Sequence, residues 1–481
     1  MKKQKMLIDG KWVDSSNGES LQIRNPATGN IFAEVASASS RDVKKAIDAA
    51  QNAFFLWANF SPVERAQYLY RVSDIILQNS SEMACTMTAE QGKPLREAES
   101  EVKGSAGIIR YFAEEIQRIY GDVIPVKESS AVSVVVRQPI GVVGAITPWN
   151  YPVQLLSWKV GAALAAGCTV IAKPSSETPL SPMEFLGCFV EAGIPKGVVN
   201  GVVGPGCTVG EALINDPLVK KIAFTGSTGV GKQVMKSCNS KLKKVSLELG
   251  GQSPLIIFSD AHFDYAIKGA VRRSFRNMGQ VCNAVNRIYV DEKIYERFVE
   301  KFVETTTKLV IDNGLENPSA DLGPMVSQKA LDKVLGHVDD AVKKGARIVC
   351  GGKKPSGDKY SKGFFFEPTI LVDVTHDMLV MQEETFGPVV GIMPFKSLPE
   401  VVSLANDTRY GLAGYVYTNN IHIIWKMCQR LDCGSIGINN VNVATPNVPY
   451  GGWKESGLGR ELGREGLEEY MQTKHIKLGF F

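Results

Sequence analysis

Short apolar runs alternate with amphipathic stretches along most of the chain after residue 139. In the first series, apolar runs of strand length are separated by segments with the spacing of an amphipathic helix. The apolar runs cover 142–146, 169–172, 198–203 and 221–225, and the helical segments cover 153–166, 181–192, 207–214 and a stretch from 229. Such alternation is typical of βαβ units on a parallel sheet. Because a second alternating series extends from 254 to 440, the pattern predicts an α/β fold.

The N-terminal part has a different pattern. Leu7-Ile8 and Lys11-Trp12-Val13 flank an Asp-Gly pair, which predicts a β-hairpin, and 26–29 predicts a second turn before 31–33. Residues 41–118 show helical spacing, with Ser40 as the expected N-cap of the first helix.

Three further segments complete the pattern. Ser259-Asp260 is expected to cap a helix whose apolar face carries residues 267–275. The segments 123–136 and 473–481 are predicted to be extended. The sequence shows no internal repeat.

The composition excludes several classes of protein. Lysine plus arginine is 54 and aspartate plus glutamate is 50, so the net charge of +4 over 481 residues gives no basis for binding nucleic acid or a membrane surface. Apolar stretches fall short of the about 20 residues that a membrane span needs. The basic N-terminus turns polar at Asp9-Gly10, so no signal peptide is expected. Nine scattered cysteines without a CxxC pair favour a cytoplasmic protein, and five histidines without a His–Cys cluster predict no metal site.

A glycine-rich turn between a predicted strand and helix, Gly226-Ser227-Thr228-Gly229-Val230-Gly231-Lys232, is the first candidate for chemistry. Free backbone N–H groups at such a helix start favour an anion. One interpretation is a P-loop nucleotide hydrolase with 255–260 as its acidic strand, although Gln233 stands where such a loop needs Ser or Thr. The others are a dinucleotide pyrophosphate site and a plain structural turn. The turn alone does not decide among them.

Motifs on both sides of the turn are more specific. They are Thr147-Pro148-Trp149-Asn150-Tyr151-Pro152, Lys173-Pro174-Ser175-Ser176-Glu177-Thr178, Leu247-Glu248-Leu249-Gly250-Gly251, Asn277-Met278-Gly279-Gln280-Val281-Cys282, Glu383-Glu384-Thr385-Phe386-Gly387-Pro388 and the segment 451–460. In this order, over nearly the whole chain, they resemble the aldehyde dehydrogenase superfamily. Gln252, where the superfamily usually has lysine, is a mild departure.

The resemblance implies a fold of three parts. A Rossmann-like cofactor-binding domain would comprise 1–119 and 139–250, and an α/β catalytic domain would comprise 251–466. A small β arm for oligomerisation would comprise 120–138 and 467–481. Because an exposed edge strand invites pairing with another subunit, a homodimer or homotetramer is expected.

The resemblance also assigns the catalytic residues. A bare carbonyl cannot release hydride, so Cys282 would first add as a thiolate to give a thiohemiacetal. Asn150, with the backbone N–H of Cys282, would donate to the resulting oxyanion. Glu248 would act as general base in the hydrolysis of the thioester, for which its pKa must be raised. The joint presence of these three residues argues against a non-catalytic structural relative. The other eight cysteines are interpreted as packing residues.

The resemblance implies that the cofactor is NAD or NADP. Lys173 would bind the adenosine ribose and Glu384 the nicotinamide ribose. Ser176 replaces a glutamate common in NAD-preferring relatives, so NADP should be tolerated, although Glu177 follows directly. The complete set of expected cofactor contacts is Trp149, Lys173, Ser176, Gly226, Ser227, Leu249, Gly250, Glu384 and Phe386.

Four residues bear on the choice of aldehyde. Trp158, where succinate-semialdehyde members carry an arginine, forms with Tyr151 and Tyr450 a set that resembles the aromatic cage of betaine- and amino-aldehyde members. Arg276 matches a second arginine of the succinate-semialdehyde group, and it would repel a cation. A small anionic or hydroxylated aldehyde, such as a semialdehyde, a lactaldehyde-like compound or its sulfonated analogue, is therefore favoured. The alternative for the substrate is a betaine aldehyde or an amino aldehyde. The alternative for Arg276 is an exposed charge at the end of a helix, without a function.

Overall fold

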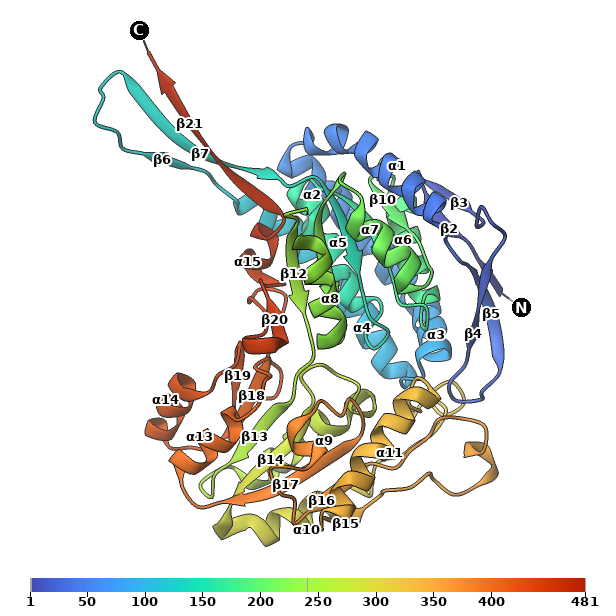
Figure 1. The fold of residues 1–481 in the computed structure, drawn as a ribbon, viewed down its shortest axis with the longest axis vertical. Helices are drawn as coiled ribbons and strands as arrows, with labels where there is room; N and C mark the ends of the chain where they lie inside the picture. The colour runs from blue at the N-terminus through green and yellow to red at the C-terminus, as the bar shows by residue number, and fades with distance from the viewer. Residues whose placement is uncertain (1, 240, 481) are drawn as a thin grey trace.

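The computed structural model describes residues 2–239 and 241–480, and two large sheets with flanking helices dominate it (Figure 1). Within the described residues, eight strands form the first sheet, in the order β20-β12-β11-β8-β9-β10-β2-β3. The neighbouring strands from β12 to β10 are parallel, as the alternating pattern predicts. These strands are β2 (Met6–Ile8), β3 (Lys11–Val13), β8 (Val142–Ile146), β9 (Thr169–Lys173), β10 (Val199–Gly201), β11 (Val219–Thr225), β12 (Lys244–Glu248) and β20 (Gly457–Leu458).

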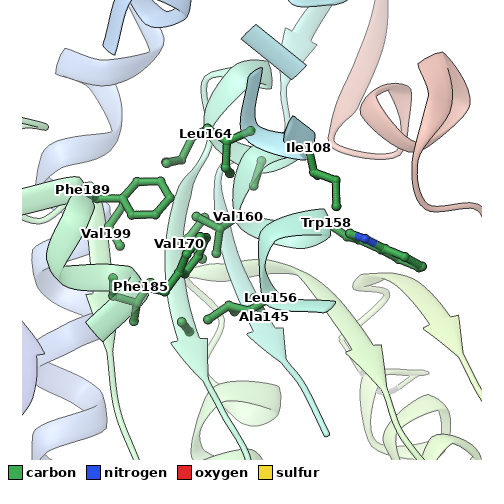
Figure 2. Packing of buried hydrophobic residues seen from close by; sticks show 14 of the residues in the cluster. Ile108, Ala145, Leu156, Trp158, Val160, Leu164, Val170, Phe185, Phe189 and Val199 are labelled. Atoms are coloured by element: carbon green, nitrogen blue, oxygen red, sulfur yellow. The ribbon is translucent and has the colours of Figure 1, made fainter. Parts of the chain in front are cut away.

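Helices cover both faces of this sheet because its central strands are buried along their whole length. Figure 2 shows Val160 and Leu164 of α5 close to Val170 of β9, with Phe185 and Phe189 of α6 in the same cluster. The helices of this part are α1 (Ser40–Ala58), α2 (Pro62–Gln78), α3 (Ser80–Gln91), α4 (Leu95–Glu115), α5 (Gln154–Ala166), α6 (Leu180–Glu191), α7 (Glu211–Asn215) and α8 (Thr228–Asn239).

The second sheet has its own apolar core. Its order within the described residues is β15-β16-β17-β14-β13-β18-β19, and only β15 is antiparallel to its neighbour. The strands are β13 (Ser253–Ile257), β14 (Val285–Asp291), β15 (Arg347–Cys350), β16 (Thr369–Val372), β17 (Val389–Phe395), β18 (Ala413–Tyr417) and β19 (Ser435–Ile438). The helices are α9 (Phe263–Phe275), α10 (Tyr295–Thr306), α11 (Gln328–Lys343), α12 (Leu379–Gln382), α13 (Leu398–Asn406) and α14 (Ile421–Arg430). The last helix, α15 (Gly463–Glu468), instead packs against α5 of the first part. The predicted α/β fold is confirmed.

Two smaller sheets lie outside these layers. β6 (Asp122–Ile124), β7 (Ala131–Pro139) and β21 (Met471–Gly479) form an arm that extends away from the body (Figure 1). β21 pairs with β7 along its whole length and is an edge strand of the arm. β1 (Lys2–Gln4), β4 (Ser20–Arg24) and β5 (Ile31–Ala36) form the other sheet. The C-terminal residue of the predicted extended segment, Phe481, lies outside the described residues.

Several predicted boundaries are wrong. The N-cap of α1 is Ser39 and not Ser40, because Ser39 and Asp42 form a capping box. Ser259-Asp260 does not cap α9, which begins only at Phe263, because the Asp260 carboxylate accepts hydrogen bonds from Thr418 Oγ1 and Asn419 N instead. The predicted helix 207–214 is a π-helical turn at Gly206–Gly210 followed by α7.

None of the helices in the described part of the chain combines the length and the hydrophobicity of a bilayer-spanning segment.

Candidate active site

A cleft of about 860 Å³ opens beyond the carboxyl ends of the strands in the first sheet. β8, β11 and β12 end at Ile146, Thr225 and Glu248, and the segments that follow them line the cleft. α11 and the segment around Glu384 close it from the side of the second sheet. The predicted residues on its wall are Trp149, Asn150, Gly226, Ser227, Leu249, Gly250, Cys282, Glu384 and Phe386.

A strained turn presents Cys282 to the cleft. Asn277 and Met278, just before it, adopt positive φ angles of 49° and 58°, a conformation that non-glycine residues rarely hold without support. The support includes a hydrogen bond from Asn277 Nδ2 to the carbonyl oxygen of Asn150 at 3.1 Å. Cys282 itself is partly buried.

The Cys282 thiol is a neutral group in these surroundings. Burial raises its pKa to about 12, and the negative charge of Glu248 is the next largest contribution in the same direction. A hydrogen bond with Tyr450 Oη, 3.7 Å from Cys282 Sγ, acts in the opposite direction. The thiol and the Glu248 carboxylate are therefore close enough to influence each other's ionisation.

Hydrogen bonds from both sides fix Asn150. Its Nδ2 donates to the carbonyl oxygen of Gln280 at 3.0 Å, and its own carbonyl oxygen accepts from Lys93 Nζ at 2.8 Å. Asn150 Oδ1 is buried and has no partner among the described residues. The side-chain amide is thus held beside the turn that carries Cys282.

Glu248 ends β12 and is only 3% exposed. Burial raises its pKa well above the ordinary value, and the nearby negative charge of Glu461 raises it further. Glu461 forms an ion pair with the buried Lys159, whose Nζ also donates to Thr225 Oγ1 at 2.7 Å. Glu248 Oε1 has no partner among the described residues. The side chain is therefore a carboxyl group with a raised pKa and a free oxygen, the state that a general base or acid near neutral pH requires.

Two glycines after Glu248 allow close packing of the backbone. A Cβ on Gly251 would lie 2.4 Å from the carbonyl oxygen of Cys282, and a Cβ on Gly250 would lie 2.6 Å from Glu384 Oε2. Gly251 N donates to Glu384 Oε1 at 3.0 Å. Side chains at these positions would separate Glu248, Cys282 and Glu384.

The groups expected to hold a nicotinamide dinucleotide fit that role. Burial lowers the pKa of Lys173 to about 8, and its Nζ donates within the described residues only to the carbonyl oxygen of Pro174, at 3.3 Å. Such a buried ammonium has capacity for further acceptors, such as ribose hydroxyls. The Trp149 and Phe386 rings meet edge to face with centroids 5.3 Å apart. Ser176 Oγ donates to the carbonyl oxygen of Gly204 at 3.0 Å, and Ser176 is not on the wall of the cleft, whereas Ser175 and Glu177 are.

The aromatic residues are close to the thiol. Trp158 and Tyr450 meet edge to face with centroids 5.4 Å apart, and Tyr450 contacts Cys282. Tyr151 is 7% exposed, and its ring already faces two protein cations: Lys93 Nζ lies 4.0 Å and Arg276 Cζ 5.6 Å from its centroid.

Comparisons with known proteins identify the family of this chain. The model of the aldehyde dehydrogenase family matches residues 12–476. The chain belongs to the aldehyde dehydrogenase family. It is 44% identical to an NADP-dependent succinate-semialdehyde dehydrogenase of Escherichia coli, over 99% of this chain and 98% of that enzyme. It is 43% identical to a 3-sulfolactaldehyde dehydrogenase of Pseudomonas putida, over 99% and 97%. The structure of Staphylococcus aureus betaine aldehyde dehydrogenase with NAD+ superposes with a TM-score of 0.96 at 36% identity, covering 98% of this chain and 94% of that chain.

Membership of the aldehyde dehydrogenase family settles the reaction class. The protein is an NAD(P)-dependent aldehyde dehydrogenase that works through a covalent cysteine intermediate. The nucleotide-hydrolase interpretation of the glycine-rich turn is wrong. Its supposed acidic strand is β13, which belongs to a different sheet from β11, and Asp260 beyond it is bonded to Thr418 and Asn419.

Sequence reasoning about this aldehyde dehydrogenase missed several charged residues. Lys93 and Glu101 form a buried ion pair, and Glu101 also accepts from the backbone N–H of Val153 at 3.0 Å, at the start of α5. Lys159 and Glu461 form a second buried pair. One signal was available: Lys159 is the one charged residue in the mostly apolar run 155–166, and a buried lysine requires a partner.

Proposed function

We propose that this aldehyde dehydrogenase oxidises a small anionic or hydroxylated aldehyde, with Cys282 as nucleophile, Asn150 as oxyanion donor and Glu248 as general base. The observation that carries the choice of substrate is that Arg276 already faces the Tyr151 ring, next to the buried Lys93–Glu101 ion pair.

The first step forms a bond between Cys282 Sγ and the carbonyl carbon of the aldehyde. The thiol must first lose its proton, and with its pKa at about 12 this loss requires a nearby acceptor. Glu248, with its raised pKa and free Oε1, supports that role. The addition places a negative charge on the former carbonyl oxygen.

Asn150 stabilises this charge. A side-chain amide nitrogen carries two N–H groups, and Gln280 uses one of them. The second is free for the oxyanion, together with the backbone N–H of Cys282. As the oxyanion re-forms the carbonyl, the carbon gives up hydride, for which a bound nicotinamide cofactor would supply the acceptor. A thioester on Cys282 remains.

Glu248 then supports hydrolysis. After the thiol proton has passed from Glu248 to solvent, the carboxylate takes a proton from water as the water oxygen adds to the thioester carbonyl. The adduct collapses to the acid and the Cys282 thiolate, which takes the proton back from Glu248. Gly250 and Gly251 allow this backbone to approach Cys282 and Glu384.

The electrostatics around Tyr151 favour an anion. The charges that act most strongly at this ring include Arg273, Arg276, Glu97 and Glu101, and Lys93 lies over its face. Within this group of five, one positive charge is in excess. A quaternary ammonium would meet this excess charge, whereas a carboxylate or sulfonate would be attracted by it. The aromatic ring set alone thus does not favour a betaine aldehyde.

The test of the substrate class is a panel of anionic, neutral hydroxylated and cationic aldehydes, with Arg276→Gln as the variant. The variant should lose about 10- to 100-fold in kcat/KM for anionic aldehydes, the size expected for a charge-assisted hydrogen bond. Neutral aldehydes should change little. Arg71→Gln is a matched control, since Arg71 lies 4.4 Å from the ring of Tyr68 on α2. If cationic aldehydes were the best substrates of the unmodified enzyme, the proposal would be wrong.

We further propose the functional division of the chain. Residues 1–119 and 139–250 would bind NAD or NADP, 251–466 would supply the cysteine, and 120–138 with 467–481 would join subunits. The exposed edge of β21 and the apolar exposed Val123, Ile124 and Leu478 on the arm support assembly into a homodimer or homotetramer. Sedimentation of the protein with and without residues 471–481 would test this role of the arm.

A further inference from the structure

A second cavity lies outside the cofactor cleft, between α4, α9 and the end of α10. Its volume is about 490 Å³, within the range of small-molecule sites. The floor is apolar and comprises Val271, Phe275, Leu309 and Leu322. The catalytic roles proposed above use none of these four residues.

The rim of this cavity is basic. Arg96, Lys268, Arg272 and Arg276 line it, against only Glu97 and Asp321 among its described residues. Asp321 neutralises Arg96, whereas the contact of Arg276 is long, 3.8 Å from its Nε to Glu97 Oε1.

Lys268 and Arg272 are the two cations of the rim whose charge has no acidic partner in the described part of the chain. Both are exposed, and neither side chain forms an ion pair or hydrogen bond with any residue that the structure describes. They are four residues apart on α9, so they project from the same face of the helix. Two adjacent cations above an apolar floor favour an organic anion.

Arg276 connects this cavity to the reacting centre. It lines the cavity, and its guanidinium also lies 5.6 Å from the centroid of the Tyr151 ring. Tyr151 directly follows Asn150, the proposed oxyanion donor. Arg276 thus borders both this cavity and the ring next to Asn150, and Lys268, Arg272 and Arg276 are not among the described residues that line the cofactor cleft.

We propose that this cavity is the entrance for the anionic aldehyde, and that Lys268 and Arg272 are specificity-determining residues that attract the anion before it reaches Arg276. This inference rests on the proposed function. Surface potentials of this kind raise the local concentration and the association rate of a charged substrate, and salt screens them. They do not change the chemical steps at Cys282.

The experiment compares Lys268→Gln/Arg272→Gln with Lys426→Gln/Arg430→Gln. The control pair is also exposed, lies four residues apart on α14 and removes the same charge. At an ionic strength of about 0.01 M, where the Debye length is about 30 Å, the first variant should lose about tenfold in kcat/KM for a carboxylate or sulfonate aldehyde. Its kcat and its kcat/KM for a neutral aldehyde should stay within about twofold of the unmodified enzyme. The loss should shrink as salt is added.

The possible outcomes separate this inference from the proposed function. If anionic aldehydes are preferred and Arg276→Gln loses them, but the two double variants behave alike, the entrance is wrong and the substrate class stands. An equal loss of kcat/KM for anionic and neutral aldehydes in Lys268→Gln/Arg272→Gln would also overturn the entrance. If this double variant does not fold, the single variant Arg272→Gln takes its place in the same measurement. If the unmodified enzyme shows no preference for anions, the proposed substrate class itself fails.

Discussion

Asn150 and Gln280 are joined by a hydrogen bond from the side-chain amide of the first to the backbone carbonyl of the second, at 3.0 Å. Gln280 belongs to the strained turn that ends at Cys282. This bond therefore sets the orientation of the amide relative to the Cys282 thiol, and it leaves one N–H of Asn150 free for the donor role proposed above. A donor fixed before the reaction costs no reorganisation when charge develops.

Replacement of Asn150 by alanine should lower kcat by about 10²- to 10³-fold, the usual cost of one oxyanion donor. Cofactor binding, measured by fluorescence titration, should be nearly unchanged. Asn150→Asp is the matched variant: it keeps the size but places a negative charge beside the oxyanion, so it should be at least as slow. A near-normal kcat in Asn150→Ala would contradict the proposed role of Asn150 as oxyanion donor.

The Tyr450 hydroxyl offers a test of the thiol environment. Its hydrogen bond with Cys282 Sγ lowers the thiol pKa, against the larger effect of burial. Tyr450→Phe should therefore raise the pKa of Cys282 and slow its alkylation by iodoacetamide at any pH below that pKa. The effect should be several-fold, and it is measured as the alkylation rate from pH 7 to 10.

Tyr417→Phe serves as the control for this measurement, because Tyr417 is also a buried tyrosine but belongs to β18. Cys282→Ala should show no alkylation at this site, no aldehyde oxidation and intact cofactor binding. Faster alkylation in Tyr450→Phe would mean that the hydroxyl does not stabilise the thiolate.

The sequence predicts the parallel-sheet fold because buried strands and amphipathic helices leave local patterns. Asn150, Glu248 and Cys282 could be assigned for another reason: each lies in a contiguous motif that resembles the aldehyde dehydrogenase superfamily. The structure brings Asn150 and Cys282 to the wall of one cleft and places Glu248 close enough to raise the pKa of the thiol.

The charge partners could not be predicted in this way. Glu97 and Arg276, or Lys159 and Glu461, are distant in the sequence and meet only after folding. The same reason explains the wrong cap of α9: Asp260 has a stronger set of partners in Thr418 and Asn419, which no local pattern reveals.

Cofactor choice can be tested at Ser176. Its hydroxyl is bonded to the carbonyl oxygen of Gly204, and no carboxylate stands at this position to repel a 2′-phosphate. Ser176→Glu should lower kcat/KM for NADP by about tenfold, a change of 1.4 kcal/mol, while NAD is affected much less. Glu177→Gln is the reciprocal variant, and it should improve the use of NADP. Equal losses with both cofactors in Ser176→Glu would contradict the assignment.

Glu461 should set the pH dependence of thioester hydrolysis through Glu248. Its negative charge is the largest contribution after burial to the raised pKa of Glu248, whereas Lys159 acts in the opposite direction. Glu461→Gln removes the first influence and leaves the second, so the pKa of Glu248 should fall. Because a general base works in its deprotonated form, the rate of thioester breakdown should then rise at a lower pH, by about one unit or more. Rapid mixing with an aldehyde and acid quenching at pH 5 to 9 measures this rate.

Glu461→Gln should also lower the free energy of unfolding, by about 3–5 kcal/mol, because it leaves Lys159 buried without its carboxylate partner. The double variant Lys159→Met/Glu461→Gln is the control: it removes both charges, so it should recover most of the stability and show a smaller shift of the pH profile. Glu248→Gln should slow both the formation and the breakdown of the thioester at every pH. A profile of Glu461→Gln that stays in place or moves to higher pH would show that Glu461 does not govern the ionisation of Glu248.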